Sequence, residues 1–207
     1  MNSMTRTAKV SIAVVAALAL GGVVTLALFL RRGFSAREEP TAVEAVVART
    51  MRHLSVPSQA RSMPNPVPLS PSILEEGRGH FADHCAICHG NDGRGQTEIG
   101  KNLYPKAPDM TAAPTQSLSD GEIFYIIKNG VRLTGMPAWG EATPEDDAAS
   151  WHLVHFIRHL PRITEQELNV MRSLNPRSPD EFREEEEQRR FLEGGTAPEP
   201  RTEKHHH

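Results

Sequence analysis

The sequence has few cysteines, few aromatic residues and no strongly basic segment. Two cysteines among 207 residues cannot build a disulfide framework, and if both serve one site, none remains for a structural disulfide. The formal net charge is −3, and no basic stripe occurs beyond the N-terminal end, so a nucleic-acid partner is not expected. No segment alternates apolar and polar residues with a period of two. The sequence therefore predicts an all-α protein.

The one long apolar segment, residues 10–30, contains 21 residues and no charge. At about 1.5 Å per residue a helix of this length crosses a hydrocarbon core of roughly 30 Å. A cleaved signal peptide would have a shorter apolar core and a small-residue cleavage site after it, whereas this run ends at Arg31 and Arg32. We expect an uncleaved transmembrane anchor, with a cleaved signal as the alternative. Basic residues flank both ends, so the positive-inside rule leaves the orientation open.

Two segments join this anchor to the rest of the chain. Residues 41–54 begin with a capping box, Thr41 and Glu44, and place apolar residues on one helical stripe. The stripe consists of Val43, Val46, Val47, Met51 and Leu54. We expect a juxtamembrane helix that rests on lipid headgroups or on a partner. Residues 55–72 hold five prolines, which predicts an extended tether that packs against nothing.

From about residue 72 the sequence is typical of a helical domain of about 90 residues. One helix leads into the cysteines, a second with a capping box spans 119–130, and a third spans 143–161. Two long loops rich in glycine and proline connect them. Beyond the domain we expect a short capped helix, a polar solvated helix and a disordered tail.

Both cysteines lie in one motif, Cys85-Ala-Ile-Cys88-His89, which has three possible interpretations. A thioredoxin-like dithiol requires a strand in a βαβ unit, and no strand is predicted. A structural zinc site requires four ligands, and no second cysteine pair exists. Covalent haem attachment fits best, because C-x-x-C-H is the attachment sequence of c-type haem. In that case Cys85 and Cys88 form thioethers, and His89 is an axial ligand of the iron.

A six-coordinate haem needs a second axial ligand far along the chain. Met136, in the loop sequence LTGMPAWG, is the preferred candidate, because Gly135 and Pro137 beside it are turn-forming residues. A methionine thioether at this position would raise the reduction potential. Met110, in the sequence PDMT, is the competing candidate, and packing in the core is the ordinary role of a single methionine.

Other residues are candidates for the surroundings of a haem. The expected apolar walls are Leu103, Phe124, Ile127 and Trp139, each of which could instead be ordinary core. The carbonyl of Pro105 or Pro108 is expected to accept a hydrogen bond from the second ring nitrogen of His89.

Three histidines, His152, His155 and His159, share one helical face. Together with His80, His84 and the terminal histidines at 205–207, they raise the alternative of a copper or zinc site. We expect instead a partly exposed polar face, because no second motif that carries ligands accompanies them.

Residues 73–161 resemble class I (mono-haem) cytochromes c, particularly the small domains related to the c subunits of haem-copper oxidases. The resemblance lies in HFADHCAICHGNDGRG, LYPKAPDM, LSDGEIFYIIKNG, LTGMPAWG and WHLVHFIRHLP, and covers under half of the chain. It implies a cytochrome c-like fold and one covalent haem c, held by Cys85 and Cys88 with His89 and Met136 as axial ligands. It also implies that the haem is attached outside the cytoplasmic membrane. The segment after Pro161 departs from the family pattern.

These inferences together predict the organisation of the chain. The expected segments are a cytoplasmic N-terminus (1–9), a transmembrane anchor (10–30), a juxtamembrane helix and proline-rich tether (31–72), a cytochrome c haem domain (73–161), a C-terminal helical extension (162–193) and a disordered tail (194–207).

The function expected from the sequence and the resemblance is electron transfer, without bond chemistry and without a small-molecule substrate. The protein would be a single-pass inner-membrane cytochrome with its haem domain in the periplasm, carrying single electrons between respiratory-chain or dehydrogenase partners. Residues 73–160 carry 7 Lys and Arg against 12 Asp and Glu, so a partner with a basic docking surface is expected. The alternatives are a haem subunit of a periplasmic oxidoreductase complex and a haem sensor or peroxidase.

Overall fold

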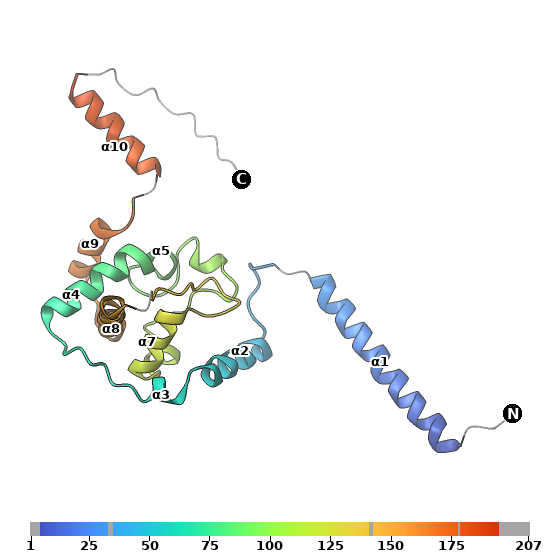
Figure 1. Ribbon diagram of the computed structural model, residues 1–207. Helices are drawn as coiled ribbons and strands as arrows, with labels where there is room; N and C mark the ends of the chain where they lie inside the picture. Colours follow the sequence, from blue (N-terminus) through green and yellow to red (C-terminus); the bar gives the residue numbers. More distant parts are fainter. Residues whose placement is uncertain (1–4, 33–34, 141–142, 178, 195–207) are drawn as a thin grey trace.

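The computed structural model describes residues 5–32, 35–140, 143–177 and 179–194, and every regular element within these ranges is a helix (Figure 1). The prediction of an all-α protein is confirmed for this part of the chain. Nearly all of the tail predicted to be disordered, residues 195–207, lies outside the described residues, as do the first four residues.

The N-terminal helix α1 runs from Arg6 to Arg32, beyond both ends of the predicted anchor. Its flanking arginines and lysine extend the helix because both residue types are good helix formers. Within residues 6–31 an 18-residue window has a mean hydropathy of 2.6, and none of that window is buried against another part of the chain. By length and composition this helix can cross a membrane.

The haem-motif region is one nearly continuous helical rod. Helix α4 (Pro71–His80) begins at Ser70, whose side chain accepts a hydrogen bond from the backbone N–H of Ile73. The rod continues through the π-helical turn η1 (Phe81–Cys85) into α5 (Ala86–His89). The remaining elements of this region are η2 (Gly100–Asn102), α6 (Ala113–Gln116), α7 (Asp120–Asn129), α8 (Pro144–His159) and η3 (Leu160–Arg162).

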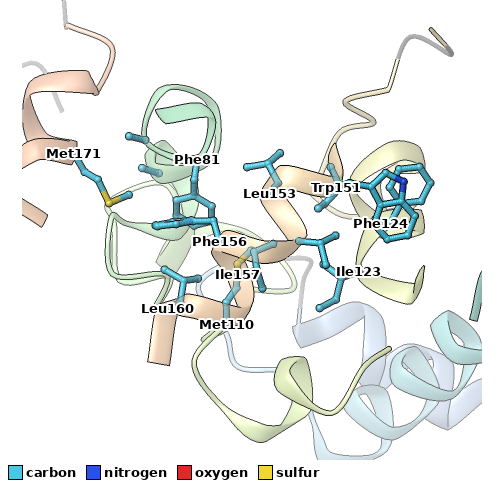
Figure 2. Packing of buried hydrophobic residues seen from close by; sticks show 14 residues of the cluster. Phe81, Met110, Ile123, Phe124, Trp151, Leu153, Phe156, Ile157, Leu160 and Met171 are labelled. Carbon is cyan, nitrogen blue, oxygen red and sulfur yellow. The ribbon is translucent and has the colours of Figure 1, made fainter. Parts of the chain in front are cut away.

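The core lies between this rod, α7 and α8 (Figure 2). Phe81 from η1 and Phe156 from α8 are both fully buried, and their ring centroids are 5.1 Å apart. Phe124 from α7 stacks on Trp151 from α8, with ring centroids 4.1 Å apart and planes inclined by 6°. These two aromatic pairs bind all three helices into one unit that positions the loops of the site.

Helix α9 (Glu165–Leu174) belongs to the packed region, although the predicted domain boundary is Pro161. Its Met171 is fully buried in the same core. The Glu167 carboxylate accepts hydrogen bonds from the backbone N–H and the hydroxyl of Thr164 and contacts His159 Nε2 at 2.8 Å. Burial alone would raise the pKa of the Glu167 carboxyl, but these bonds from Thr164 and His159 outweigh it and lower the pKa.

Helix α10 (Pro179–Leu192) follows α9, and its side chains described by the structure are exposed to solvent.

The proline-rich segment differs from its prediction. Helix α2 (Ala42–Ser55) forms as expected, and residues 56–70, here called the strap, include the short helix α3 (Ser58–Arg61). Within the strap Val56 is only 3% exposed, and Ala60 is also buried. An ideal Cβ on Gly121 in α7 would lie 1.8 Å from the carbonyl oxygen of Ala60, so the strap and α7 are in close backbone contact.

The extended end of the strap is bonded to α8. Asn65 Nδ2 donates to the carbonyl of Trp151 at 3.0 Å, and His155 Nε2 lies 2.8 Å from the carbonyl oxygen of Val67. The expectation of a tether that packs against nothing is therefore wrong for residues 56–70. The prolines do give extended backbone, but the residues between them find partners on α7 and α8.

Candidate haem site

The π-helical turn aligns the cysteine motif. The backbone N–H of Ala86 donates to the carbonyl of Phe81, five residues back, and the ordinary α-helix resumes at Ala86. Cys85, Cys88 and His89 then stand at positions i, i+3 and i+4, which share one face of a helix. Sequence reasoning expected the helix to end near the cysteines and did not predict the π-helical turn, a feature that is frequent at functional sites.

Both thiols are free, and neither has the properties of a redox dithiol. Burial, followed by the influence of Cys88, raises the pKa of the Cys85 thiol to about 12, and burial also raises the pKa of Cys88. Reactive C-x-x-C pairs need a lowered thiol pKa. The two side chains are therefore neutral at pH 7 in the haem-free chain, and the dithiol interpretation loses its chemical basis.

His89 is buried and only 7% exposed. Burial lowers the pKa of its imidazole, and the nearby Pro108 carbonyl partly opposes this change. The Pro108 contact lacks full hydrogen-bond geometry, and ring atom Nδ1 is buried with no hydrogen-bond partner. A neutral buried imidazole with an unsatisfied nitrogen is suited to binding a metal ion. Of the two prolines considered from the sequence, Pro108 is the one near the ring.

The segment after the motif closes over its end. The carbonyl of Cys88 accepts a hydrogen bond from Thr97 Oγ1 at 3.0 Å, and the carbonyl of His89 accepts one from the backbone N–H of Gly95 at 2.7 Å. An ideal Cβ on Gly100 would lie only 2.1 Å from the Cys88 carbonyl oxygen. These contacts fix the backbone of two motif residues, and only glycine fits at position 100.

Met136 lies in the loop of residues 130–140, between α7 and α8. Its carbonyl accepts from the N–H of Val131 at 3.1 Å, and its N–H donates to Thr134 Oγ1 at 3.1 Å. The side chain of Met136 is partly exposed, whereas Met110 is buried in the core cluster (Figure 2). Met110 thus has the ordinary packing role of a methionine, and Met136 does not.

Two contacts join the Met136 loop to the motif region. The Trp139 ring stacks on His84, with centroids 5.3 Å apart and planes inclined by 14°. An ideal Cβ on Gly135 would lie 2.7 Å from a methyl carbon of Leu103, in the loop that follows the motif. The sequence named His84 only as a possible member of a histidine metal site and did not indicate that it would stack on Trp139. Its stacking partner is 55 residues away.

The four predicted wall residues divide into two pairs. Phe124 and Ile127 are buried in the core cluster, which fits their alternative role as ordinary core residues. Leu103 and Trp139 are partly or largely exposed and contact the residues just described. Trp139 thus lies against the residue before the motif, and Leu103 against the loop with Met136.

The histidines of α8 have separate partners. His152 Nδ1 lies 3.1 Å from Glu76, His155 contacts the strap, and His159 contacts α9. In the ranges that the structure describes, no three His, Cys, Asp or Glu side chains gather as a metal site.

The residues present at the motif fit a covalent haem. Two unpaired thiols and a buried neutral imidazole share one helical face, and a methionine-bearing loop packs against the residue that precedes them. None of these groups is used by a disulfide, and His89 Nδ1 has no partner within the protein.

Comparisons with known proteins agree with this chemistry. Residues 73–157 match the family model described as cytochrome c oxidase, cbb3-type, subunit III. The chain is 38% identical over 73 residues to the cbb3-type cytochrome c oxidase subunit FixP of Sinorhizobium medicae, a match covering 35% of this chain and 23% of FixP. It is 33% identical over 79 residues to the subunit CcoP of Cereibacter sphaeroides, covering 38% and 25%.

The chain therefore spans about a quarter of the length of the curated relatives that it matches. Among solved structures, a chain of the Kuenenia stuttgartiensis reducing HAO-like protein complex matches with 22% identity, a TM-score of 0.40, and coverage of 48% of this chain and 49% of that one. This likeness is too slight to carry an argument. The motif and the family match together identify residues 73–157 as a c-type cytochrome domain with covalently bound haem c, related to the c subunits of haem-copper oxidases.

Proposed function

We propose that this protein is a membrane-anchored periplasmic cytochrome that transfers single electrons through one haem with histidine and methionine axial ligands. Cys85 and Cys88 would hold the haem through thioethers, and His89 and Met136 would fill the two axial positions. When bound, the haem supplies a reversible one-electron couple. With both axial positions filled by side chains, no coordination site remains for a substrate.

The contact between Trp139 and His84 is the observation that carries this proposal. It brings the loop with Met136 against the residue next to Cys85, although 47 residues separate Met136 from His89. The buried Met110 supports the same assignment, because removing it from the core to reach iron would leave a cavity.

Two observations support the proposed location. Helix α1 is long and apolar enough to cross a membrane, and the resemblance to c-type cytochromes implies that the haem is attached outside the cytoplasmic membrane. α1 would cross the inner membrane once with its N-terminus in the cytoplasm, and the haem domain would lie in the periplasm. Because the domain is acidic, its redox partners would dock through basic surfaces. Electron-transfer rates would then fall as ionic strength rises.

The strap favours a second candidate function, that of a fixed haem subunit in an oxidoreductase complex. A flexible tether of 36 residues, from 37 to 72, would give the domain an r.m.s. reach of roughly 35 Å. With α2 folded, residues 56–70 docked and Glu39 Oε1 2.7 Å from Lys106 Nζ, the linker is at most residues 33–41. Its r.m.s. reach would be roughly 15–18 Å even if all of it were flexible. Such a domain moves little from its anchor.

A matched pair of leucine substitutions tests the axial assignment. Met136→Leu and Met110→Leu both remove a thioether and nearly preserve volume, so each should fold. We expect Met136→Leu alone to lower the midpoint potential and to make the reduced protein bind carbon monoxide rapidly. Absorption spectra recorded during a redox titration give the midpoint potential, and spectra of the reduced protein before and after adding carbon monoxide show whether it binds. Rapid binding to the wild-type protein, or the same change in Met110→Leu only, would refute the assignment.

Isolation separates the two candidate functions. Mild detergent extraction followed by size-exclusion chromatography would yield a stoichiometric complex for a fixed subunit, and the single chain for an independent carrier.

A further inference from the structure

Helix α2 has an apolar stripe that nothing in the described structure covers. The five stripe residues, Val43, Val46, Val47, Met51 and Leu54, have exposed fractions from 49% for Val47 to 72% for Val43. A helix that is amphipathic by sequence ordinarily turns its apolar face to a core. In α2 the apolar face is the one turned outward.

The covered side of α2 is opposite the stripe. Only Ala45 and Arg52 in this helix are partly covered, and all its other residues are exposed. Arg52 follows Val43 by nine residues, or two and a half turns, so the two side chains project to opposite sides. Ala45 lies two turns before Arg52 and shares its side. The haem domain therefore lies behind the polar side of α2, and the stripe points away from it.

Both ends of α2 are attached to the haem domain. Near its start, Glu44 hydrogen-bonds to the phenol of Tyr104, and partial desolvation together with this bond raises the pKa of that phenol. Near its end, His53 Nδ1 lies 3.3 Å from Glu122 Oε1 on α7. Val56 is buried immediately after the helix. Figure 1 shows α2 and α3 running along the outside of the domain, below α7.

The chain itself places a membrane near α2. Residues 33–41 join it to α1, and ten fully extended Cα steps span at most about 35 Å. The stripe is built from valine, leucine and methionine, and α2 contains no aromatic residue. Protein-binding hot spots are enriched in tryptophan, tyrosine and arginine, whereas a lipid surface accepts aliphatic side chains without shape complementarity. Arg49, close to one edge of the stripe, can extend its charge to the headgroups.

From this geometry we infer that α2 lies in the surface of the same bilayer that α1 crosses, with its apolar stripe among the lipids and its polar side holding the haem domain. The helix is then a bracket between the membrane and the cytochrome. It fixes the distance between the domain and the bilayer, and it turns the side of the domain that carries Tyr104 and Glu122 toward the bilayer. This inference requires α1 to span the membrane, but it does not depend on which methionine binds the iron.

Neighbouring residues on α2 allow a matched test in the full-length, haem-loaded protein. The two natural cysteines are consumed by thioethers, so a single introduced cysteine can carry a nitroxide spin label. The pair is Val47→Cys on the stripe and Ala48→Cys, which is exposed on another side of the helix. Gln166→Cys on α9 is the aqueous reference. The protein is reconstituted at high dilution in vesicles of phosphatidylcholine and phosphatidylglycerol.

Collision with oxygen, which dissolves in lipid, is compared with collision with a water-soluble nickel complex. We expect the label at 47 to collide preferentially with oxygen, and the labels at 48 and 166 to collide preferentially with the nickel complex. Equal access of nickel to positions 47 and 48 would show the stripe in water and overturn the inference. Shielding of position 47 from both reagents would indicate a protein contact, including a second copy of this chain, and would also overturn it.

The orientation of the haem provides an independent readout. In oriented membrane multilayers, the angular dependence of the haem electron paramagnetic resonance spectrum reports how uniformly the domain is tilted. We expect a narrow distribution for the wild type and for Ala48→Asp, and a broadened one for Val47→Asp, because a charge on the stripe is expelled from lipid. Equally narrow spectra for both aspartate variants would refute the bracket. Neither experiment measures electron transfer, so failure of the proposed function would not affect them.

Discussion

Replacing Gly77 with alanine should destabilise the haem domain, whereas the same replacement at Gly79 should not. Both glycines lie in α4. An ideal Cβ on Gly77 would be 2.3 Å from the carbonyl oxygen of His152 and 3.2 Å from Phe156 Cβ. At Gly79 an ideal Cβ would have no heavy atom within 4 Å outside its own helix. The first position is where the backbones of α4 and α8 touch, and the second faces open space.

The size of the effect follows from these distances. Ordinary contact begins at 3.4 Å, so a methyl group at position 77 would have to move α8 away by roughly 1 Å. Overpacking of this kind costs about 1–3 kcal/mol, against a gain in helix propensity of about 0.5–1 kcal/mol. The difference lies between about 0 and 2.5 kcal/mol, and we expect a net loss of about 1 kcal/mol for Gly77→Ala. Gly79→Ala should gain about 0.4–1 kcal/mol from the lower entropy of the unfolded chain.

Urea unfolding of the haem-loaded full chain, followed by Soret absorbance and by far-ultraviolet circular dichroism, measures both variants. The two signals must coincide, and the dependence on urea must be unchanged, for the midpoints to be compared as free energies. The midpoint should fall for Gly77→Ala and rise for Gly79→Ala. A midpoint for Gly77→Ala at or above that of the wild type would mean that α4 and α8 are not in backbone contact at this residue.

Three further predictions concern the strap, α9 and the motif. Asn65→Ala removes the donor to the Trp151 carbonyl and should cost about 1 kcal/mol and speed hydrogen exchange in residues 56–70; unchanged exchange would contradict the docked strap. Because the pKa of Glu167 is lowered by folding, its stabilising effect is present above the ordinary glutamate pKa of about 4.3 and is lost as pH falls through the folded value. Glu167→Gln should therefore flatten the decline of stability in acid, measured by urea midpoints across that range, and an equally steep decline would count against it. Cys85→Ala and Cys88→Ala should each retain haem after denaturing electrophoresis through the remaining thioether, and only the double variant should lose the haem stain.

The motif and the helix caps could be predicted because their chemistry is local. Haem attachment needs two thiols and an imidazole at fixed spacing, and that spacing is written in five consecutive residues. The capping boxes at Thr41, Ser119 and Thr164 each form as the sequence indicates, because the two partners are three residues apart. These features involve no contact between distant segments.

The strap and α9 could not be predicted, because both depend on surfaces formed by other elements. Prolines between residues 57 and 71 do favour extended backbone, but docking is decided by Gly121 of α7 and by the Trp151 carbonyl and His155 side chain of α8, which the sequence does not reveal as partners. Met171 is one of four apolar residues in α9, with Leu168, Val170 and Leu174, and the sequence does not show that it is the fully buried one. The stacking of His84 on Trp139 is of the same kind, since neither residue indicates its distant partner.

Helix α7 contacts α2 and the strap at one end and the loop with Met136 at the other. At its start, Gly121 touches the strap and Glu122 pairs with α2. At its end, the carbonyls of Ile127 and Lys128 accept hydrogen bonds from the backbone N–H groups of Trp139 and Gly140, in the loop with Met136. Ten residues of α-helix are about 15 Å long. One short rigid helix therefore contacts α2, which is proposed to lie on the membrane, and also supports the loop with the proposed axial ligand. Because its middle is stacked on α8 in a close-packed core, which has low compressibility and transmits strain, we expect a displacement at the α2 end of α7 to reach the loop with Met136.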